Sequence, residues 1–505
     1  MSNAGNLSSV LSGWPEPERT ALVDLSAGRV REFSFGALSS LSDSVARGLH
    51  SRFGSGRFRV GIVARNSAEF VALYFGTMRA GGVAVPISWK LPPEILEYVL
   101  TDASVDAVFS DGSCELPDSA SAVRIDRDWT SFLDPGCFEP APVSRDSLAQ
   151  ILYTSGSTGR PKGVPLTHGG QFWAVEKAAS LITDPSSYRV LVAAPLFHMN
   201  ALFNVKRTLY CRSTVVLLPH FTAQDYERAI EEFHCDWVTC VPAMMALLAR
   251  HLGDRVLPPR FAAVRRVFMS SSSFSPQLLA TVQRMFPNAH IANSYGTTEA
   301  GPHVFQGHPN GLPTPPMSCG HPYSPDHVRL VGEDERVIQG EGQGVLEMNT
   351  PATASGYLNL PETSAQLFRD GWYNSRDIMR RDANGFYYFM GRVDDMFTCG
   401  GENIYPIEVE QILERHPDIE QAVVVPVPDE IKQSLPVAFV VPRSGANLDE
   451  TPLKEWFLDR APGFMCPRRI GFVKEIPLAQ TNKVDRGHLS EMARKLMARS
   501  PQPQS

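Results

Sequence analysis

Short apolar runs that alternate with helical segments organise the first half of the chain. Residues 59–64 form an apolar run typical of a buried strand, and residues 69–79 follow it with apolar side chains at helical spacing. Residues 81–86 have the pattern of the next strand. Further strand-like runs occur at 189–194, 214–218, 236–241 and 265–269. Because strands that alternate with helices build parallel sheets, this pattern predicts a large α/β domain.

After about residue 318 the pattern changes to shorter strands between turns. The runs at 327–331, 344–348 and 385–389 are separated by Gly, Pro and Asp residues, which predicts a β-rich lobe. From residue 392 a smaller unit follows, with helices at 406–415, 451–459 and 487–498 and strands at 422–427 and 437–441. We therefore expect a large N-terminal domain (1–391), a hinge (392–395) and a small C-terminal α/β domain (396–505).

Composition and charge narrow the class of protein. The chain has 505 residues, of which 43% are apolar and 20% charged, and this length predicts several packed lobes while the composition excludes a mainly disordered protein. The formal charge of -7 comes without runs of like charge, so we expect neither nucleic acid nor a membrane as partner. No apolar stretch reaches the ~18–20 residues of a membrane span. The start of the chain lacks the layout of a secretion signal, and the eight scattered cysteines predict free thiols in the cytoplasm.

A dense run of glycine, hydroxyl and lysine residues follows the apolar residues 151–153. It reads Thr-Ser-Gly-Ser-Thr-Gly-Arg-Pro-Lys-Gly from Thr154 to Gly163. Glycines let the backbone approach phosphate oxygens, hydroxyl groups donate hydrogen bonds, and the lysine adds positive charge. The Gly-Lys-Ser/Thr ending of a Walker loop is missing. The run predicts a phosphate-binding loop, and the alternative is a flexible surface linker.

Five segments, in order, resemble the sequence blocks of one enzyme superfamily. They are 153–163, Asn-Ser-Tyr-Gly-Thr-Thr-Glu at 293–299, Gly-Trp-Tyr-Asn-Ser-Arg-Asp at 371–377, Gly-Arg-Val-Asp-Asp at 391–395 with Gly-Gly-Glu-Asn-Ile at 400–404, and Gln-Thr-Asn-Lys at 480–483. The chain thereby resembles the adenylate-forming superfamily of acyl- and aryl-CoA ligases, luciferases and peptide-synthetase adenylation domains. This resemblance implies activation of a carboxylic acid by ATP and Mg²⁺, with release of pyrophosphate, by large α/β and β-rich lobes and a mobile C-terminal domain.

The resemblance also implies which residues hold the nucleotide. Thr298 would touch the α-phosphate, Glu299 would bind Mg²⁺, and Tyr295 would stack on adenine unless it is only a core tyrosine. Asp377 would accept hydrogen bonds from the ribose hydroxyls. The family usually has Thr-Gly where this chain has Ser375 and Arg376. The complete ATP-binding set implied by the resemblance is Thr154, Ser155, Gly156, Ser157, Thr158, Gly159, Lys162, Ser273, Asn293, Tyr295, Gly296, Thr297, Asp377 and Arg392.

The catalytic residues implied by the resemblance are Lys483, His198 and Thr298. Lys483, on a loop of the small domain, would bridge the substrate carboxylate and the α-phosphate, although a lone lysine is ordinarily a solvated surface charge. Asp394 matches the hinge position about which the small domain rotates between the two half-reactions.

A pocket for the acid and the amine is expected around residues 194–203. His198 resembles the family's gate beside the acyl group, with a core histidine as the alternative. Hydroxyl groups at 270–273, where relatives commonly have Gly and Ala, favour a flat aryl or heteroaryl acid over a long alkyl chain. The expected pocket residues are His198, Ala201, Phe203, Val241, Pro242, Ser271 and Ser272.

The acceptor of the acyl group leaves several alternatives open. CoA ligases usually carry Gly-Glu or Gly-Gln where this chain has Gln433 and Ser434, and Cys466 stands where aryl-CoA ligases tend to have a basic residue. These departures resemble the stand-alone amide bond synthetases, such as that of marinacarboline biosynthesis, and favour an amine as acceptor. The alternatives are an aryl- or acyl-CoA ligase, a module that charges a separate carrier protein, and a protein that only binds nucleotide.

Overall fold

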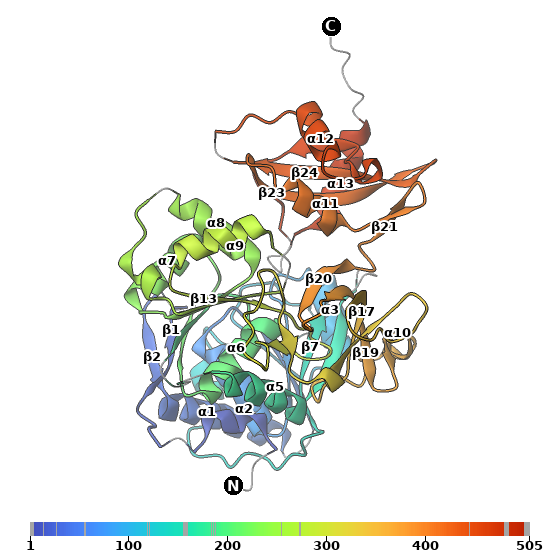
Figure 1. The fold of residues 1–505 in the computed structure, drawn as a ribbon. Helices are drawn as coiled ribbons and strands as arrows, with labels where there is room; N and C mark the ends of the chain where they lie inside the picture. The colour runs from blue at the N-terminus through green and yellow to red at the C-terminus, as the bar shows by residue number, and fades with distance from the viewer. Residues whose placement is uncertain are drawn as a thin grey trace.

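The structure is a computed structural model, and it places most of the chain. The residues that it describes are 5–13, 15–26, 28–54, 57–118, 120, 122–154, 160–182, 184, 186, 188–253, 255–271, 274–443, 445–478 and 484–498. A larger body contains the first four-fifths of the chain, and a smaller C-terminal body, red in Figure 1, lies beside it and is joined to it near β20 (Tyr387–Arg392).

Two mainly parallel sheets form the centre of the larger body. One has the order β13-β12-β11-β9-β10-β1-β2, in which only β1 and β2 pair antiparallel, and the other has the order β6-β5-β3-β4-β7-β8, in which only β7 and β8 pair antiparallel. The strands of the first sheet are β1 (Thr20–Asp24), β2 (Arg31–Ser34), β9 (Arg189–Val192), β10 (Thr214–Leu217), β11 (Trp237–Cys240), β12 (Arg266–Ser270) and β13 (His290–Ser294). Those of the second are β3 (Arg59–Val63), β4 (Val83–Pro86), β5 (Ala107–Ser110), β6 (Ala122–Arg124), β7 (Leu148–Thr154) and β8 (Lys162–Thr167).

Helices cover the sheets and fill the space between them. A single buried cluster joins side chains of both sheets with those of α1, α2 and α6, and a second cluster lies under α7, α8 and α9. Serine or threonine side chains cap the N-termini of α1, α2, α5, α7 and α9 by accepting a backbone hydrogen bond, as such residues favour. The helices are α1 (Phe35–Phe53), α2 (Ala68–Arg79), α3 (Pro93–Asp102), α4 (Trp129–Phe132), α5 (His168–Ser180), α6 (Met199–Tyr210), α7 (Ala223–Glu232), α8 (Pro242–Leu252) and α9 (Pro276–Met285).

The predicted β-rich lobe and C-terminal unit are each built on an antiparallel sheet. The lobe has the order β16-β17-β19-β18, and β20 pairs with β19. Its elements are β16 (Val328–Val331), β17 (Gly342–Met348), α10 (Pro361–Leu367), β18 (Phe368–Arg369), β19 (Trp372–Arg381) and β20. The C-terminal sheet has the order β22-β21-β24-β23, and β25 pairs with β24 in parallel. Its elements are β21 (Phe397–Cys399), β22 (Glu402–Ile404), α11 (Pro406–Leu413), β23 (Ile419–Asp429), β24 (Gln433–Pro442), α12 (Glu450–Leu458), β25 (Arg469–Phe472) and α13 (Arg486–Ala498). The predicted fold class, parallel α/β lobes with a β-rich lobe and a small α/β unit, is confirmed.

Candidate active site

A buried carboxylate joins three of the predicted sequence blocks. Asp377 of β19 is 4% exposed, and its Oδ1 accepts a hydrogen bond from Arg392 Nη1 at 2.6 Å. The Tyr295 hydroxyl donates to Asp377 Oδ2 at 2.5 Å. Burial raises the pKa of Tyr295, so that this hydroxyl keeps its proton at neutral pH. Each carboxylate oxygen has two lone pairs, so Asp377 retains capacity for a further donor while Arg392 and Tyr295 hold it in place.

The register of two strands explains this meeting. Asp377 and Arg392 are direct partners in the antiparallel pair β19–β20, so their side chains emerge on one face of the sheet. Tyr295 follows β13, the edge strand of the first sheet, and its ring packs edge-on against Phe305 at 5.8 Å between centroids. Anchored at both its hydroxyl and its ring, Tyr295 has a fixed orientation.

The turn after Tyr295 is closed by backbone contacts. The Thr297 N–H donates to Gly301 O at 2.9 Å, and the Ala300 N–H donates to Thr297 Oγ1 at 3.0 Å. A Cβ on Gly296 would lie 2.3 Å from the backbone of Pro302, so only glycine fits there. Asn293 precedes this turn and donates from Nδ2 to Met317 O at 3.0 Å.

Glu299 lies at the buried end of this turn, next to a lysine of the predicted phosphate loop. Glu299 Oε1 accepts a hydrogen bond from the Tyr357 hydroxyl at 2.9 Å, and Lys162 Nζ lies 5.2 Å from the centroid of the same tyrosine ring. Burial raises the pKa of Glu299, and the positive charges of Arg392 and Lys162 oppose this increase. A buried carboxylate of this kind favours a nearby cation.

The ends of the predicted phosphate loop face each other across a hairpin. Thr154 ends β7, Lys162 begins β8, and the two are paired in register. The sequence between them contains Ser155, Gly156, Ser157, Thr158 and Gly159, which lie outside the described residues. Lys483, Ser272 and Ser273 also lie outside them.

Three of the predicted pocket residues, His198, Ala201 and Phe203, lie at the start of α6. His198 is the residue before this helix, and its ring contacts that of Phe197 at 4.5 Å between centroids. Ala201 and Phe203, one turn further along, are each 1% exposed, whereas Val241 and Pro242 lie at the start of α8. Ser271, which follows β12, has a φ of +74°, a left-handed conformation that suits the glycine common in relatives.

The predicted hinge residue is held by two arginines. Asp394 Oδ1 lies 2.7 Å from Arg376 Nη2, and Asp394 Oδ2 lies 3.6 Å from Arg392 Nη2. Arg376 has a φ of +58°, again a conformation that glycine adopts more readily. The residue that replaces the usual glycine of the ribose block therefore binds the hinge position directly.

Comparison with known protein families now assigns the chain. Residues 14–358 match the model of the AMP-binding enzymes, and residues 408–483 match the model of their C-terminal domain. This chain belongs to the AMP-binding enzymes of the adenylate-forming superfamily. It is therefore an ATP-dependent, adenylate-forming ligase.

Curated relatives cover nearly the whole length of this ligase. A feruloyl-CoA synthase of an Amycolatopsis species is 30% identical over 491 residues, which are 95% of this chain and 98% of the relative. An indoleacetate–CoA ligase of Aromatoleum aromaticum is 27% identical over 485 residues, or 92% and 93% of the two chains.

Solved structures show the same fold. The anthranilate CoA ligase AuaEII in complex with anthranoyl-AMP aligns with a TM-score of 0.85 at 24% identity, covering 98% of each chain. The MenE o-succinylbenzoate CoA synthetase of Bacillus subtilis, with its acyl-adenylate intermediate, aligns with a TM-score of 0.81 at 25% identity, covering 96% of this chain and 98% of that one.

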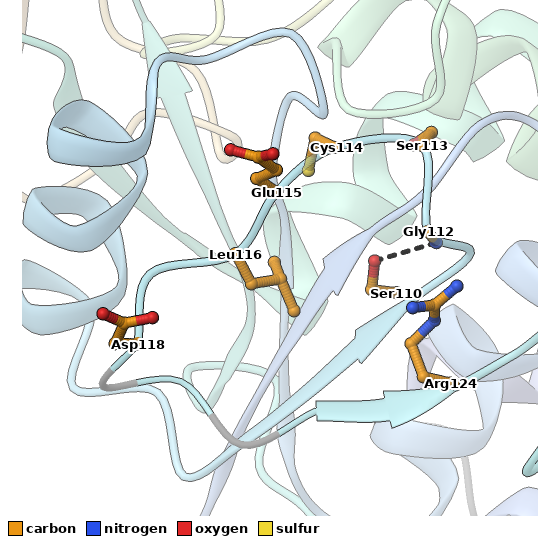
Figure 2. A pocket seen from close by; sticks show the side chains of 8 residues that line it. All are labelled: Ser110, Gly112, Ser113, Cys114, Glu115, Leu116, Asp118 and Arg124. Carbon is orange, nitrogen blue, oxygen red and sulfur yellow. Dashed lines mark hydrogen bonds between the residues drawn. The ribbon is translucent and has the colours of Figure 1, made fainter.

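One hollow of the ligase lies apart from this site. A hollow of about 720 Å³ lies beside the end of β5, where the Gly112 N–H donates to Ser110 Oγ next to Arg124 (Figure 2), and it contains none of the predicted site residues. All eight cysteines are free thiols. Within the described ranges, no helix is long and apolar enough to cross a bilayer.

Sequence reasoning missed two residues that the structure adds to the site. Tyr357 bonds to Glu299, but it follows a glycine in a turn without any motif, and no sequence signal marks it. Arg376 was visible as a departure from the family pattern, yet its ion pair with Asp394 depends on how the chain leaves β20.

Proposed function

We propose that this ligase converts an aryl or heteroaryl acid to its acyl-AMP and passes the acyl group to an amine, which gives an amide and AMP. The observation that carries the proposal is the meeting of Tyr295, Asp377 and Arg392 in one hydrogen-bonded group, close to Glu299. We further propose that residues 1–391 and 396–505 act as two domains that rotate about the hinge 392–395.

The first half-reaction joins two anions. A carboxylate oxygen of the acid attacks the α-phosphorus of ATP, the bond from this phosphorus to the bridging oxygen breaks, and pyrophosphate leaves. Lys162 and Arg392 supply positive charge near the phosphates, Thr298 donates to the α-phosphate, and Lys483 bridges the two reacting groups. Such fixed charges stabilise the transition state because they need no reorganisation as negative charge develops.

Glu299 fits the role of Mg²⁺ ligand. It is a buried carboxylate with a raised pKa, and a hard cation that prefers oxygen ligands would compensate its charge. Within the part of the chain that the structure describes, no three His, Cys, Asp or Glu side chains gather into a metal site. Mg²⁺ would therefore be held by Glu299 together with phosphate oxygens, and it would neutralise charge on the departing pyrophosphate.

In the second half-reaction an unprotonated amine attacks the acyl carbon. The bond between this carbon and the phosphate oxygen breaks, AMP leaves, and the amine nitrogen loses a proton. His198 is our candidate to receive that proton, because it is the residue before α6 and lies beside the position predicted for the acyl group.

The hairpin of the C-terminal unit supports an amine rather than coenzyme A. Gln433 stands at the glycine position of CoA ligases and keeps a left-handed φ of +68°, so its side chain projects where glycine has none. Burial raises the pKa of Cys466, which leaves a neutral thiol at a position that is often basic in aryl-CoA ligases. The Gln433 side chain would obstruct the path of coenzyme A. Cys466 lacks the positive charge that would help to bind it.

Coenzyme A is the second candidate acceptor, and the relatives favour it. The feruloyl-CoA synthase and the indoleacetate–CoA ligase both match this chain over more than nine-tenths of its length. Their names support an aromatic acid as substrate and a thioester as product.

One experiment separates the two acceptors. The enzyme is incubated with ATP, Mg²⁺ and ferulate, indole-3-acetate or anthranilate, and with either coenzyme A or phenethylamine, and the products are identified by mass spectrometry. We expect amide with the amine and little thioester. Thioester without amide would contradict the proposed acceptor. The variant Gln433→Gly restores the usual glycine. If the Gln433 side chain obstructs coenzyme A, this variant should form more thioester than the wild type.

A further inference from the structure

A buried arginine lies near the end of α6 that is remote from His198. Arg207 is 2% exposed, and its guanidinium carbon lies 4.0 Å from the ring centroid of Trp237 and 5.1 Å from that of Phe268. Its Nη2 donates to Asn204 Oδ1 at 2.8 Å. Among the described residues, no carboxylate pairs with Arg207.

A second guanidinium increases this imbalance of charge. Arg266 lies 5.1 Å from the centroid of the same Trp237 ring, and its Nε donates to the Tyr188 hydroxyl at 3.1 Å, which is an uncharged partner. Burial lowers the pKa of Arg207 to about 10, so it remains a cation at neutral pH. Aromatic faces and one amide oxygen compensate a buried guanidinium only in part, because its five N–H groups favour carboxylate or phosphate partners.

Arg207 lies close to residues predicted for the acid pocket. It shares α6 with Ala201 and Phe203, and its guanidinium is 5.6 Å from the centroid of the Phe203 ring. Phe268 lies on β12, which leads directly into the pocket residue Ser271. Helix α6 and strand β12 therefore lead to predicted pocket residues and also contribute side chains around Arg207.

Two polar aromatic residues, His303 and Tyr323, lie close to Phe268 and Arg207. The Tyr323 hydroxyl and His303 Nδ1 form a hydrogen bond, and the His303 ring lies 5.3 Å from Phe268 and 6.4 Å from Phe203 between centroids. Burial, aided by the charge of Arg207, lowers the pKa of His303 to about 3, yet both His303 and Tyr323 keep part of their surface accessible. His303 is neutral there, so it adds hydrogen bonding and no charge.

We propose that Arg207 binds an anionic group of the substrate, and that this ligase selects aromatic acids that carry a second carboxylate at the end away from the reacting one. A planar carboxylate matches the guanidinium fork, and the aromatic side chains around it match a flat ring. This inference rests on the proposed function, because it assigns the substrate class of the same acid pocket.

The test compares matched pairs of acids in acid-dependent exchange of labelled pyrophosphate into ATP. The pairs are benzoate with terephthalate and cinnamate with 4-carboxycinnamate. For the wild-type enzyme we expect kcat/KM to be at least about ten-fold higher for the diacid of one pair, as a charge-assisted hydrogen-bonded pair allows. Equal use of both acids, or preference for the mono-acid in both pairs, would overturn the role of Arg207.

A variant and a matched control locate the selectivity. Arg207→Met should lose the preference for the diacid, so that the ratio of kcat/KM between diacid and mono-acid, both measured on this variant, falls to about one. Lys206→Met removes a neighbouring buried lysine, whose Nζ donates to Gln171 Oε1 at 2.6 Å, and it should keep the wild-type preference. Loss of the preference in Lys206→Met, or its retention in Arg207→Met, would contradict the assignment.

The outcomes distinguish this inference from the proposed function. The ratio of kcat/KM for the diacid to that for the mono-acid, measured on the wild-type enzyme, tests the inference even if Arg207→Met does not fold. Exchange with mono-acids alone would contradict only the role of Arg207. Exchange with none of a broad set of acids, the four named here included, would contradict adenylate formation itself.

Discussion

The guanidinium of Arg376 lies 2.7 Å from the carboxylate of Asp394, and this ion pair links the ribose block to the proposed hinge. The Val393 N–H also donates to Arg376 O at 2.8 Å, so backbone and side chain hold the same turn. Rotation about Asp394 would either break this ion pair or move both of its residues together. If rotation breaks the pair, the pair stabilises the arrangement seen here relative to the rotated one.

Arg376→Gly should make that rotation easier. It removes a partly exposed ion pair, which contributes up to about 1 kcal/mol, and it relaxes a left-handed backbone. We expect the rate of amide formation, relative to that of pyrophosphate exchange, to rise by up to about five-fold. Both rates are measured on the same enzyme preparation. Glu335→Gly is the control, because Glu335 has a φ of +60° in an exposed turn outside the site; an equal change in both variants would contradict the role of the pair.

Asp377→Asn should weaken ATP binding more than it slows the chemical step. The variant loses a charged acceptor for the ribose and loosens both Arg392 and Tyr295, and hydrogen bonds to charged groups contribute about 1.5–3 kcal/mol. We expect KM for ATP to rise about ten- to one-hundred-fold. Tyr295→Phe, which keeps the ring and removes only one hydrogen bond to Asp377, should cause a smaller rise. An unchanged KM in Asp377→Asn would be incompatible with ribose binding.

Glu414 should make the stability of the enzyme fall as pH rises. It follows α11, its Oε1 accepts from the Ala422 N–H at 3.0 Å, and its backbone oxygen accepts from Gln277 of the larger body. Burial, with the nearby charge of Glu410, raises the pKa of Glu414 to about 8. The folded state therefore keeps a proton that the unfolded chain releases near pH 4.5. The stabilisation is complete below pH 4.5 and is lost as pH rises through about 8, with a slope of up to about 1.4 kcal/mol per pH unit.

Glu414→Gln should remove this slope. Chemical unfolding between pH 5 and 9 measures the free energy of unfolding of the variant and of the wild type. The variant should become more stable relative to the wild type as pH rises. Glu420→Gln is the control, since Glu420 is a partly exposed carboxylate paired with Arg250 at 3.0 Å and should leave the slope intact. A parallel pH dependence in Glu414→Gln and wild type would show that Glu414 is not the responsible group.

Lys483→Ala should abolish adenylation while ATP still binds. A group that acts in the transition state lowers kcat and kcat/KM together when it is removed. We expect pyrophosphate exchange to fall at least about one-hundred-fold, as for loss of a transition-state charge contact, with a change of less than about three-fold in the Kd of ATP. Lys474→Ala, an alanine substitution of another lysine in the C-terminal unit, should leave both unchanged. Equal losses of exchange and of ATP affinity in Lys483→Ala would place this lysine in ground-state binding.

The sequence predicted those elements whose apolar runs are uninterrupted. The strands β3, β9 and β11 lie within two residues of the expected positions, because each run is buried on both faces of a parallel sheet. Helix α6 escaped prediction. It is buried along most of its length, yet it contains Lys206 and Arg207, which break the apolar pattern that marks a buried helix.

The site could be predicted from the sequence only at residues that belong to segments occurring in the same order as in the family. Asp377 and Arg392 were assigned together because their blocks recur in a fixed order, and the structure places them as strand partners. Arg207 and His303 both lie against Phe268 of β12, an arrangement that no local pattern encodes. Partners of this kind depend on tertiary contacts between segments about one hundred residues apart.

The exchange of labelled pyrophosphate into ATP tests the central claim most directly. The enzyme is incubated with ATP, Mg²⁺ and each acid of an aromatic panel, without any acceptor. The account predicts exchange that requires an acid, requires Mg²⁺, and disappears in Lys483→Ala. Exchange that never appears with any acid, while ATP still binds, would contradict it.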